Sequence, residues 1–186
     1  MSIRIRPLTT PYFSQVIALG NHVHGDGYLD AEMMHQIATK GSKDGINANF
    51  VALDDERLIG FRLTYAPGSW TFDRWCTPAS WSVPPEQLCY FKCNTVAKEY
   101  RGQGVGGSLL RASIAATKKQ GAIGGLSHLW KQSPDNSAVG YFTRAGGRLI
   151  KEHPNRWSNN PDHPDYVCVL CGESCHCTAC EMLLLY

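Results

Sequence analysis

Residues 96–107, Val-Ala-Lys-Glu-Tyr-Arg-Gly-Gln-Gly-Val-Gly-Gly, are the part of the sequence that decides the fold. The stretch before them, LCYFKCNTV at 88–96, predicts a strand, and the apolar spacing from Gly104 to Gln120 predicts an amphipathic helix. The glycines therefore lie where a strand turns into a helix. The first amide groups of a helix have no intrahelical partner and lie at the positive end of its dipole. Because glycine has no Cβ atom, an anion can approach these amides closely, so the segment predicts a phosphate-binding loop.

Two common nucleotide-binding loops fit this segment poorly. Gly102, Gly104 and Gly107 match the dinucleotide fingerprint G-x-G-x-x-G. That fingerprint requires an acidic residue about 20 positions further on, and residues 121–130 contain no Asp or Glu. A phosphate loop of the Walker type is also excluded, because no Lys-Ser or Lys-Thr pair follows the last glycine. The glycines could also do no more than cap a helix, which is the structural alternative.

Strands and helices alternate on both sides of the glycine segment. We predict a first strand at 2–8, a helix that ends at Gly20, and a short second helix that begins after Asp30 and ends at Gly41. Further strands and one further helix are predicted from periodicity and glycine boundaries: strands NFVAL (49–53), RLIGFRLTY (57–65), GLSHLW (125–130) and GRLIKE (147–152), and a helix at 135–145. This order predicts an α+β or α/β fold with one mostly continuous sheet.

Two motifs resemble the GNAT (Gcn5-related) N-acetyltransferase superfamily. Arg101-x-x-Gly104-x-Gly106, after a Val-x-x-x-Tyr turn, resembles the family's acyl-CoA loop. A helix rich in alanine and aromatic residues that ends in Gly146 resembles its second signature, and the order of elements agrees over residues 3–152. The resemblance implies the GNAT fold: a central mixed, mostly antiparallel sheet with helices on both faces and a splayed strand pair at the acyl-CoA site.

The resemblance also implies which residues contact the cofactor, acetyl-CoA. Thr95, Val96 and Lys98 would lie along the pantetheine arm, and Arg101 would add positive charge at the loop. Phe142 occupies the position of the family's usual tyrosine, and we expect it to pack near the thioester. The pyrophosphate would be bound by the loop residues Gly102, Gln103, Gly104, Val105, Gly106, Gly107 and Ser108.

The implied reaction is N-acyl transfer, in which an amine attacks acetyl-CoA directly in a ternary complex. It requires a neutral amine, a polarised thioester carbonyl and a proton for the leaving thiolate. The strand before the loop has no carboxylate to act as base, and Tyr141 lies one residue, about 100° of helix, from the family's tyrosine position. The catalytic residues therefore remain unassigned. The alternative function is a catalytically inactive acyl-CoA-binding sensor or interaction module.

Three other groups are candidates for the acceptor side of the site. His128 lies in a predicted strand beside the expected substrate cleft, as a base or as a structural residue. The segment NHVHGDGY contains His22, His24 and Asp26 and either borders the acceptor or forms a solvated turn. The third is the long loop at 66–87, which either covers the acceptor or simply packs on the sheet through Trp70, Asp73, Trp75 and Trp81.

Five of the eight cysteines lie near the C-terminus, outside the family pattern. Two C-x-x-C pairs predict a structural zinc site with four ligands: Cys168, Cys171, Cys177 and Cys180. Cys175 and His176 are spare ligands, and thiols without metal or a redox site are the alternatives. The predicted division is a GNAT core at 1–152 and a cysteine-rich C-terminal hairpin at 153–186, formed by VCVL and EMLLLY, that completes the sheet.

Composition limits the partners of this 186-residue chain. With 43% hydrophobic and 18% charged residues it is a folded globular chain, and a net charge of +2 argues against nucleic-acid or membrane binding through bulk charge. No apolar run approaches the roughly 18 residues of a membrane span, and the start MSIRIRPLTTP lacks signal-peptide features, so we expect a cytoplasmic protein. The expected partner is a small-molecule or peptide amine. The sequence leaves the oligomeric state open, a homodimer included.

Overall fold

A computed structural model describes residues 3–159 and 164–186. Seven strands form one sheet in the order β1-β4-β5-β6-β7-β9-β8, and β2 and β3 form a separate hairpin. The strands are β1 Ile3–Pro7, β2 Ser42–Lys43, β3 Ile46–Asn47, β4 Phe50–Asp54, β5 Arg57–Tyr65, β6 Leu88–Val96, β7 Gly124–Trp130, β8 Arg148–Pro154 and β9 Thr178–Leu185. The helices are α1 Phe13–His24, α2 Ala31–Lys40, α3 Val105–Lys119 and α4 Ser137–Arg144, with short 3-10 turns at Thr10–Tyr12, Pro78–Ser80, Pro85–Gln87, Lys98–Tyr100 and Pro134–Asn136.

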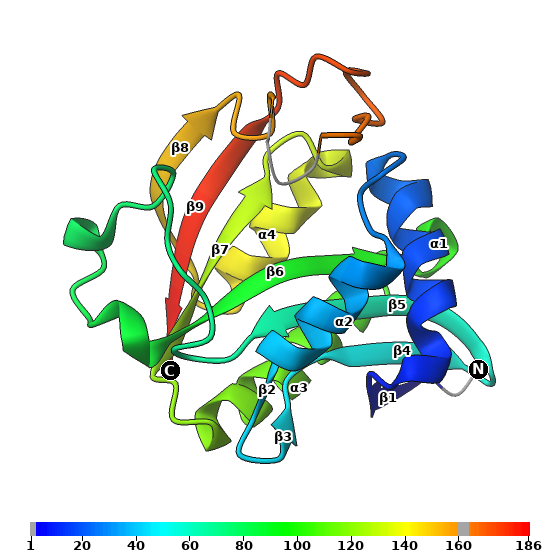
Figure 1. Cartoon of the computed structure of the whole chain (residues 1–186), viewed down its shortest axis with the longest axis horizontal. Coiled ribbons are helices and arrows are strands. Elements are labelled where there is room, and N and C mark those ends of the chain that lie inside the picture. The colour runs from blue at the N-terminus through cyan, green and yellow to red at the C-terminus, as the bar shows by residue number, and fades with distance from the viewer. Residues whose placement is uncertain (1–2, 160–163) are drawn as a thin grey trace.

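Both faces of the sheet are covered (Figure 1). Helices α1 and α2 pack on one face of β4 and β5, while α3 and α4 pack on the opposite face. The loop at 66–87 takes the place of a helix over β7 and β9, where Trp81 packs against Leu88, Leu126 and Leu183. The first face is therefore covered by the α1–α2 pair at one side and by the loop at 66–87 at the other. The middle of the sheet lies between these two coverings.

The predicted fold class is confirmed. Every strand pair of the large sheet is antiparallel except β6 with β7, which is parallel. The second helix has the predicted boundaries, since the Asp30 side chain accepts a hydrogen bond from the Met33 amide and Gly41 follows the last turn. The prediction that the first helix ends at Gly20 is wrong. Gly20 lies inside α1 because the helix packs closely on Leu29 there, and the helix ends at Gly25, where φ is +122°.

The C-terminal strand, β9, is an inner strand of the sheet and not an edge strand. Strand β9 pairs along its length with β7 on one side and with β8 on the other, so β8 is the edge strand. The predicted pairing of VCVL with EMLLLY is wrong, because residues 167–170 form no strand and Cys168 is bridged to Gly172 instead. No helix in the described parts of the chain is long and apolar enough to cross a bilayer.

Candidate active site and cysteine cluster

The centre of the molecule is open where β6 and β7 separate. The two strands pair only from Leu88 to Tyr90, after which the Ser127 hydroxyl donates to the Phe91 carbonyl oxygen at 2.7 Å. On its other side, β6 stays paired with β5 as far as Val96, with a register shift opposite Lys92. The backbone of β6 beyond Phe91 therefore has one edge without a neighbouring strand. Such an edge can pair with an extended ligand.

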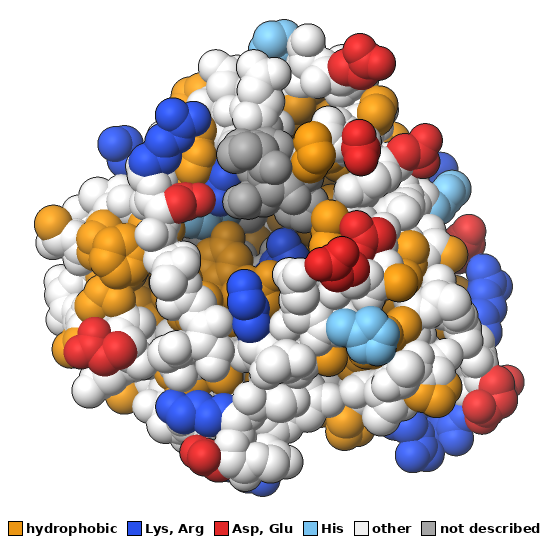
Figure 2. Space-filling model, viewed as in Figure 1, with side chains coloured by type: hydrophobic (Ala, Val, Ile, Leu, Met, Phe, Trp, Pro, Cys, Tyr) orange, Lys and Arg blue, Asp and Glu red, His pale blue; other side chains and the backbone are white. Residues whose placement is uncertain are grey.

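A cavity of about 1450 Å³ lies at this opening. It is bounded by β6, by the glycine loop, by the end of α1, by α2 and α4, by part of the loop at 66–87 and by the C-terminal cysteine segment; we call it the central cavity. Figure 2 shows a hollow near the centre of this face, with Lys and Arg side chains in and beside it. Among the described residues, its lining has one acidic side chain, Asp73, against seven cationic ones: Lys40, Arg62, Lys92, Arg101, Arg111, Arg144 and Arg156. The charge of the lining favours an anionic ligand.

The glycine loop has the conformation that an anion-binding helix start requires. Gly102 and Gly104 have φ of +74° and +80°, which only glycine adopts without strain, and α3 begins at the next residue. The Arg101 side chain folds back and donates from Nε to the Val96 carbonyl oxygen at 3.1 Å, which fixes the loop on the end of β6. The first residues of α3 line the central cavity, at the positive end of the helix where the amides have no intrahelical partner.

Most residues expected at the cofactor line this cavity, and two do not. The lining includes the expected residues Thr95, Val96, Arg101, Gly102, Gln103, Gly104, Val105, Gly106, Gly107 and Ser108. Lys98 is exposed in a 3-10 turn and is not among the residues that line the cavity. Phe142 is completely buried, with its ring 5.8 Å from that of Phe91, so it is a core residue and not a cavity residue.

Tyr141, in contrast, lines the cavity, contrary to our expectation from helix geometry. Its hydroxyl oxygen accepts a hydrogen bond of 2.7 Å from Arg62 Nη1. Arg62 is 1% exposed, and its guanidinium lies 4.4 Å from the centre of the Phe91 ring. None of the ion pairs between described side chains involves Arg62, and its Nε has no hydrogen-bond partner there. A buried cation without a carboxylate thus adjoins the Tyr141 hydroxyl.

A histidine, a threonine and a cysteine form a cluster at the end of α1. His24 Nε2 lies 2.9 Å from Thr95 Oγ1 and 3.8 Å from Cys93 Sγ, and all three line the cavity. Burial, with a smaller effect from Arg101, lowers the pKa of His24 to about 4, so its imidazole is neutral at pH 7. Burial also raises the pKa of the Cys93 thiol, which therefore remains protonated. The predicted candidate His22 is exposed and does not line the cavity.

His128 is the second neutral histidine of the cavity. Its Nε2 lies 2.7 Å from the Trp75 carbonyl oxygen, which can only accept, so Nε2 carries the hydrogen. In the neutral ring Nδ1 then accepts from the Tyr90 hydroxyl, 3.0 Å away. Burial lowers the pKa of His128 to about 4, although the Trp75 carbonyl and the charge of Glu181 oppose that shift. The hydrogen bonds leave the oxygen lone pairs of Tyr90 available to a ligand.

The loop at 66–87 is fixed to the sheet by a buried carboxylate. Glu181 of β9 accepts hydrogen bonds from the Thr77 amide, the Thr77 hydroxyl, Trp81 Nε1 and His153 Nε2, all at 2.7–2.9 Å. Burial alone would raise the pKa of Glu181, but these hydrogen bonds lower it. Of the predicted acceptor residues of this loop, only Trp70 and Asp73 line the cavity. Trp75 and Trp81 instead pack on the protein.

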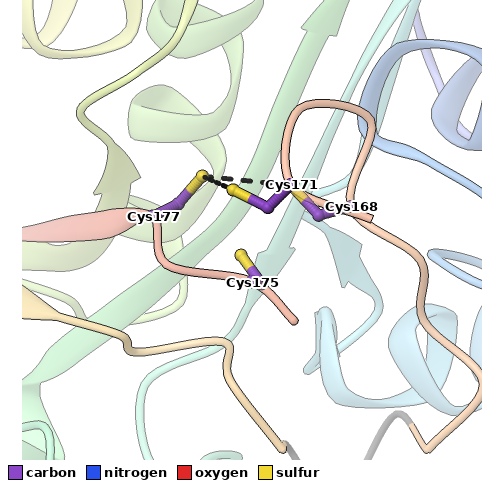
Figure 3. A group of neighbouring side chains, drawn as sticks. All are labelled: Cys168, Cys171, Cys175 and Cys177. Carbon is purple, nitrogen blue, oxygen red and sulfur yellow. Dashed lines mark hydrogen bonds between the residues drawn. The ribbon is translucent and has the colours of Figure 1, made fainter. Parts of the chain in front are cut away.

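The C-terminal cysteines form a second cluster (Figure 3). The sulfur atoms of Cys168, Cys171, Cys175 and Cys177 all lie within 4.8 Å of one another. Cys180, which we predicted as the fourth ligand, lies outside this cluster: it belongs to β9 and is buried in the core beneath α4. Cys175, which we predicted as a spare ligand, takes its place. His176 is exposed and contributes nothing to the group.

Several residues of the cavity were missed from the sequence. Arg62, Tyr90 and Tyr166 line it, yet each lies in a stretch without a recognised motif. Arg62 could have been identified from the sequence. A cation inside the apolar strand RLIGFRLTY is unusual unless it has a partner or a function. For Tyr166 we find no such signal, since it comes from an irregular segment next to the cysteine cluster.

Comparisons with known proteins agree with this architecture. A sequence model described as the Acetyltransferase (GNAT) family matches residues 10–147. Ard1 from Thermoplasma volcanium superposes with a TM-score of 0.69 at 12% identity, covering 100% of this chain and 99% of that chain. Naa50 from Arabidopsis thaliana, solved in complex with the bisubstrate analogue CoA-Ac-MVNAL, superposes with a TM-score of 0.66 at 13% sequence identity. The match covers 100% of this chain and 100% of that chain.

A GNAT acetyltransferase from Elizabethkingia anophelis with acetyl-CoA bound gives a TM-score of 0.62 at 19% identity, covering 99% of this chain and 98% of that chain. At such identities these likenesses show the fold alone. A search of curated protein sequences found no match. The matched family segment covers more than half of the chain, supports acyl transfer and does not favour the inactive binding module. The protein is a member of the GNAT acetyltransferase family.

Proposed function

We propose that the protein is an acetyl-CoA-dependent N-acetyltransferase in which an amine attacks the thioester directly within a ternary complex. One observation carries the proposal: the open edge of β6 leads directly into the glycine loop at the start of α3. An extended pantetheine arm can pair with that edge while its pyrophosphate contacts the loop amides. Family membership supports the same assignment.

The cofactor residues follow from the cavity lining. Thr95 and Val96 would lie along the pantetheine arm, with Arg101 and the amides of 102–108 at the pyrophosphate. We remove Lys98 and Phe142 from the expected set, because one points to solvent and the other is in the core. The cationic side chains of the lining would balance the phosphate charges of the cofactor.

The proton of the attacking amine would leave through Tyr90 and His128. The Tyr90 oxygen can accept that proton while its own passes to Nδ1 of the neutral His128 ring, 3.0 Å away. The imidazolium formed in this way is stabilised by the Trp75 carbonyl, which accepts from Nε2. The pair would thus replace the missing carboxylate of the strand before the loop.

The proton for the leaving thiolate would come from Tyr141. Because its oxygen accepts from Arg62, the hydroxyl hydrogen of Tyr141 is directed elsewhere and can be donated into the cavity. The buried guanidinium of Arg62 would also stabilise the negative charge that develops on sulfur. The new C–N bond forms as the thioester C–S bond breaks, and CoA takes up the Tyr141 proton to leave as the free thiol. The Tyr141 oxyanion then gains a proton from water and the His128 imidazolium loses one to water, which restores the resting site.

A covalent cysteine intermediate is the main competing mechanism. Cys93 lies in the cavity beside His24, an arrangement that resembles a nucleophile and its base. Its raised pKa argues against it, because a protonated thiol is a poor nucleophile. Cys89 does not line the cavity, so it is not a candidate nucleophile. Its sulfur is hydrogen-bonded to the Tyr186 hydroxyl.

The test is CoA release from acetyl-CoA with a panel of small amines, amino acids and peptides with free N-termini. We expect turnover with at least one acceptor class, and an acetylated amine in the mass spectrum. Acetyl-CoA binding without turnover on any acceptor would support the inactive module instead. An acetyl group trapped on Cys93 in the absence of acceptor would contradict direct attack.

A further inference from the structure

We propose that Cys168, Cys171, Cys175 and Cys177 bind one structural Zn²⁺ ion, and that this ion fixes the acceptor end of the central cavity. The site would be closed, with four thiolate ligands and no position left for a substrate. It uses a different set of residues from the acyl-transfer site. The metal site itself therefore does not depend on the reaction that the cavity catalyses, whereas naming this end of the cavity the acceptor end rests on the proposed function.

Two of the sulfur–sulfur separations match those of a tetrahedral zinc site, and all four sulfur atoms lie within 4.8 Å of one another. A Zn–S distance of about 2.3 Å places the sulfur atoms of a tetrahedron about 3.8 Å apart. Cys177 Sγ lies 3.6 Å from Cys171 Sγ and 3.9 Å from Cys168 Sγ. These separations are far longer than the roughly 2.05 Å of a disulfide. The four side chains also point toward one another from two separate segments (Figure 3).

The backbone around the cluster has the form of a metal-binding knuckle. Cys168 and Gly172 exchange two backbone hydrogen bonds of 3.0 and 2.9 Å, and Gly172 has a φ of +74°. This tight turn holds Cys168 and Cys171, the two cysteines of the first C-x-x-C pair, on one short segment with their sulfur atoms within 4.8 Å of each other. Two thiols presented by one tight turn are the usual half of a four-cysteine zinc site.

The same segment forms a wall of the central cavity. The Val167 amide donates to the Asp26 carbonyl oxygen at 2.9 Å, and the Val169 amide donates to that of His24 at 3.2 Å. The Tyr166 hydroxyl donates to the same His24 oxygen at 2.9 Å. The cysteine segment is therefore bonded to the turn between α1 and α2.

Two glycines make this approach possible. A Cβ atom on Gly25 would lie 1.9 Å from the Val167 carbonyl oxygen, and one on Gly27 would lie 2.5 Å from that of Asp165. The turn that we expected to contact an acceptor through Asp26 is therefore built for contact with the cysteine segment. A metal ion that fixes the knuckle would also fix His24, and through it the contact with Thr95.

The first experiment measures metal and ligands on the full-length protein. We expect one equivalent of zinc per chain, and an X-ray absorption spectrum with four sulfur neighbours at about 2.3 Å. Absence of stoichiometric metal, stoichiometric iron in place of zinc, or a disulfide among these cysteines would each overturn the proposal.

The second experiment compares Cys175→Ala with Cys180→Ala. Because Cys175 is in the cluster and Cys180 is in the core, only Cys175→Ala should lose bound zinc. Zinc loss in Cys180→Ala with retention in Cys175→Ala would overturn the ligand set. If Cys175→Ala does not fold, the absorption spectrum of the unmodified protein still decides whether the site exists.

The third experiment tests the role of the ion by hydrogen–deuterium exchange of the zinc-loaded and chelator-treated protein. We expect metal removal to speed exchange in 23–28 and 165–169, with little change in the glycine loop at 102–108. Equal exchange in the two forms would contradict the positioning role. Because these readouts do not use acetyl transfer, their failure is distinguishable from a failure of the proposed activity.

Discussion

The two ends of the central cavity are built in different ways. The proposed cofactor end is lined by Thr95, Val96 and residues 100–108 of one continuous segment, whose conformation depends on its own glycines. The proposed acceptor end is lined by side chains that are far apart in the sequence, among them His24, Tyr90, His128 and Tyr141. The first kind of site can be recognised as a local motif. The second exists only when the sheet, the helices and the loop at 66–87 have assembled around it.

The largest expected effect concerns the acceptor end. Tyr141→Phe should lower kcat by about 100-fold, because it removes one proton donor of general acid catalysis. The matched variant Phe142→Tyr should retain kcat and lose roughly 1–3 kcal/mol of stability, since it places a hydroxyl in the core. Steady-state kinetics and urea unfolding measure the two effects. An unchanged kcat in Tyr141→Phe would contradict the role of Tyr141 as proton donor.

The second prediction concerns pH. The folded-state pKa of His128 is lowered to about 4, below its unfolded value of 6.5. Between these values the unfolded chain binds more protons, so stability falls as pH falls. We expect His128 alone to contribute a loss of roughly 2 kcal/mol in unfolding free energy between pH 7 and pH 5. Equal unfolding free energies at the two pH values would contradict the lowered pKa.

His24 adds to the same pH window, because its pKa is lowered in the same direction. Glu181 affects the pH dependence of stability at lower pH than the two histidines do. Its folded-state pKa is depressed, so its contribution is complete above the unfolded carboxylate range and is lost as pH falls through the folded pKa. A second decrease in stability below about pH 4.5 is therefore expected. Glu181→Gln should remove this second decrease and leave the first.

A smaller effect is expected at the cofactor end. Gly104→Asn and Gly104→Asp both tolerate the left-handed conformation, but only the second adds a negative charge at the start of α3. We expect Gly104→Asp to raise the KM for acetyl-CoA about tenfold relative to Gly104→Asn, equivalent to about 1.4 kcal/mol. The difference should shrink at high salt. Equal KM values would argue against phosphate at this position.

The smallest effect is predicted for Cys93→Ser. Direct attack does not use this thiol, so kcat should change by less than about tenfold, against the thousandfold or greater loss that follows removal of a nucleophile. The serine hydroxyl can still bond to Thr95, which limits the loss of stability. Loss of all turnover in a folded variant would revive the covalent mechanism.

The sequence predicts well where a local rule controls the conformation. The strand at 88–96 and the glycine turn into α3 have the predicted bounds, because each is specified by residues within it. Tyr141 and Phe142 lie in a helix of only eight residues that follows left-handed backbone at Asp135 and Asn136. That irregular start sets which side chain points to the cavity, and counting back from Gly146 cannot detect it.

The cysteines show the same limit. Two C-x-x-C pairs made Cys180 the expected partner of Cys177. In the structure, β9 begins at Thr178, and its pairing with β7 and β8 takes Cys180 into the core. Cys175 lies on the free segment before the strand and can turn toward the knuckle. The choice between these thiols is therefore made by strand pairing, which the spacing of cysteines does not encode.

The position of β9 has a consequence for the order in which the chain assembles. In the large sheet β8 pairs only with β9, so β8 must wait for a segment that is synthesised later. The carboxylate that anchors the loop at 66–87 arrives with the same strand. A nascent chain can thus form the glycine loop early, but it cannot complete the acceptor side until β9 has left the ribosome. The proposed cofactor end can therefore fold before the proposed acceptor end during synthesis.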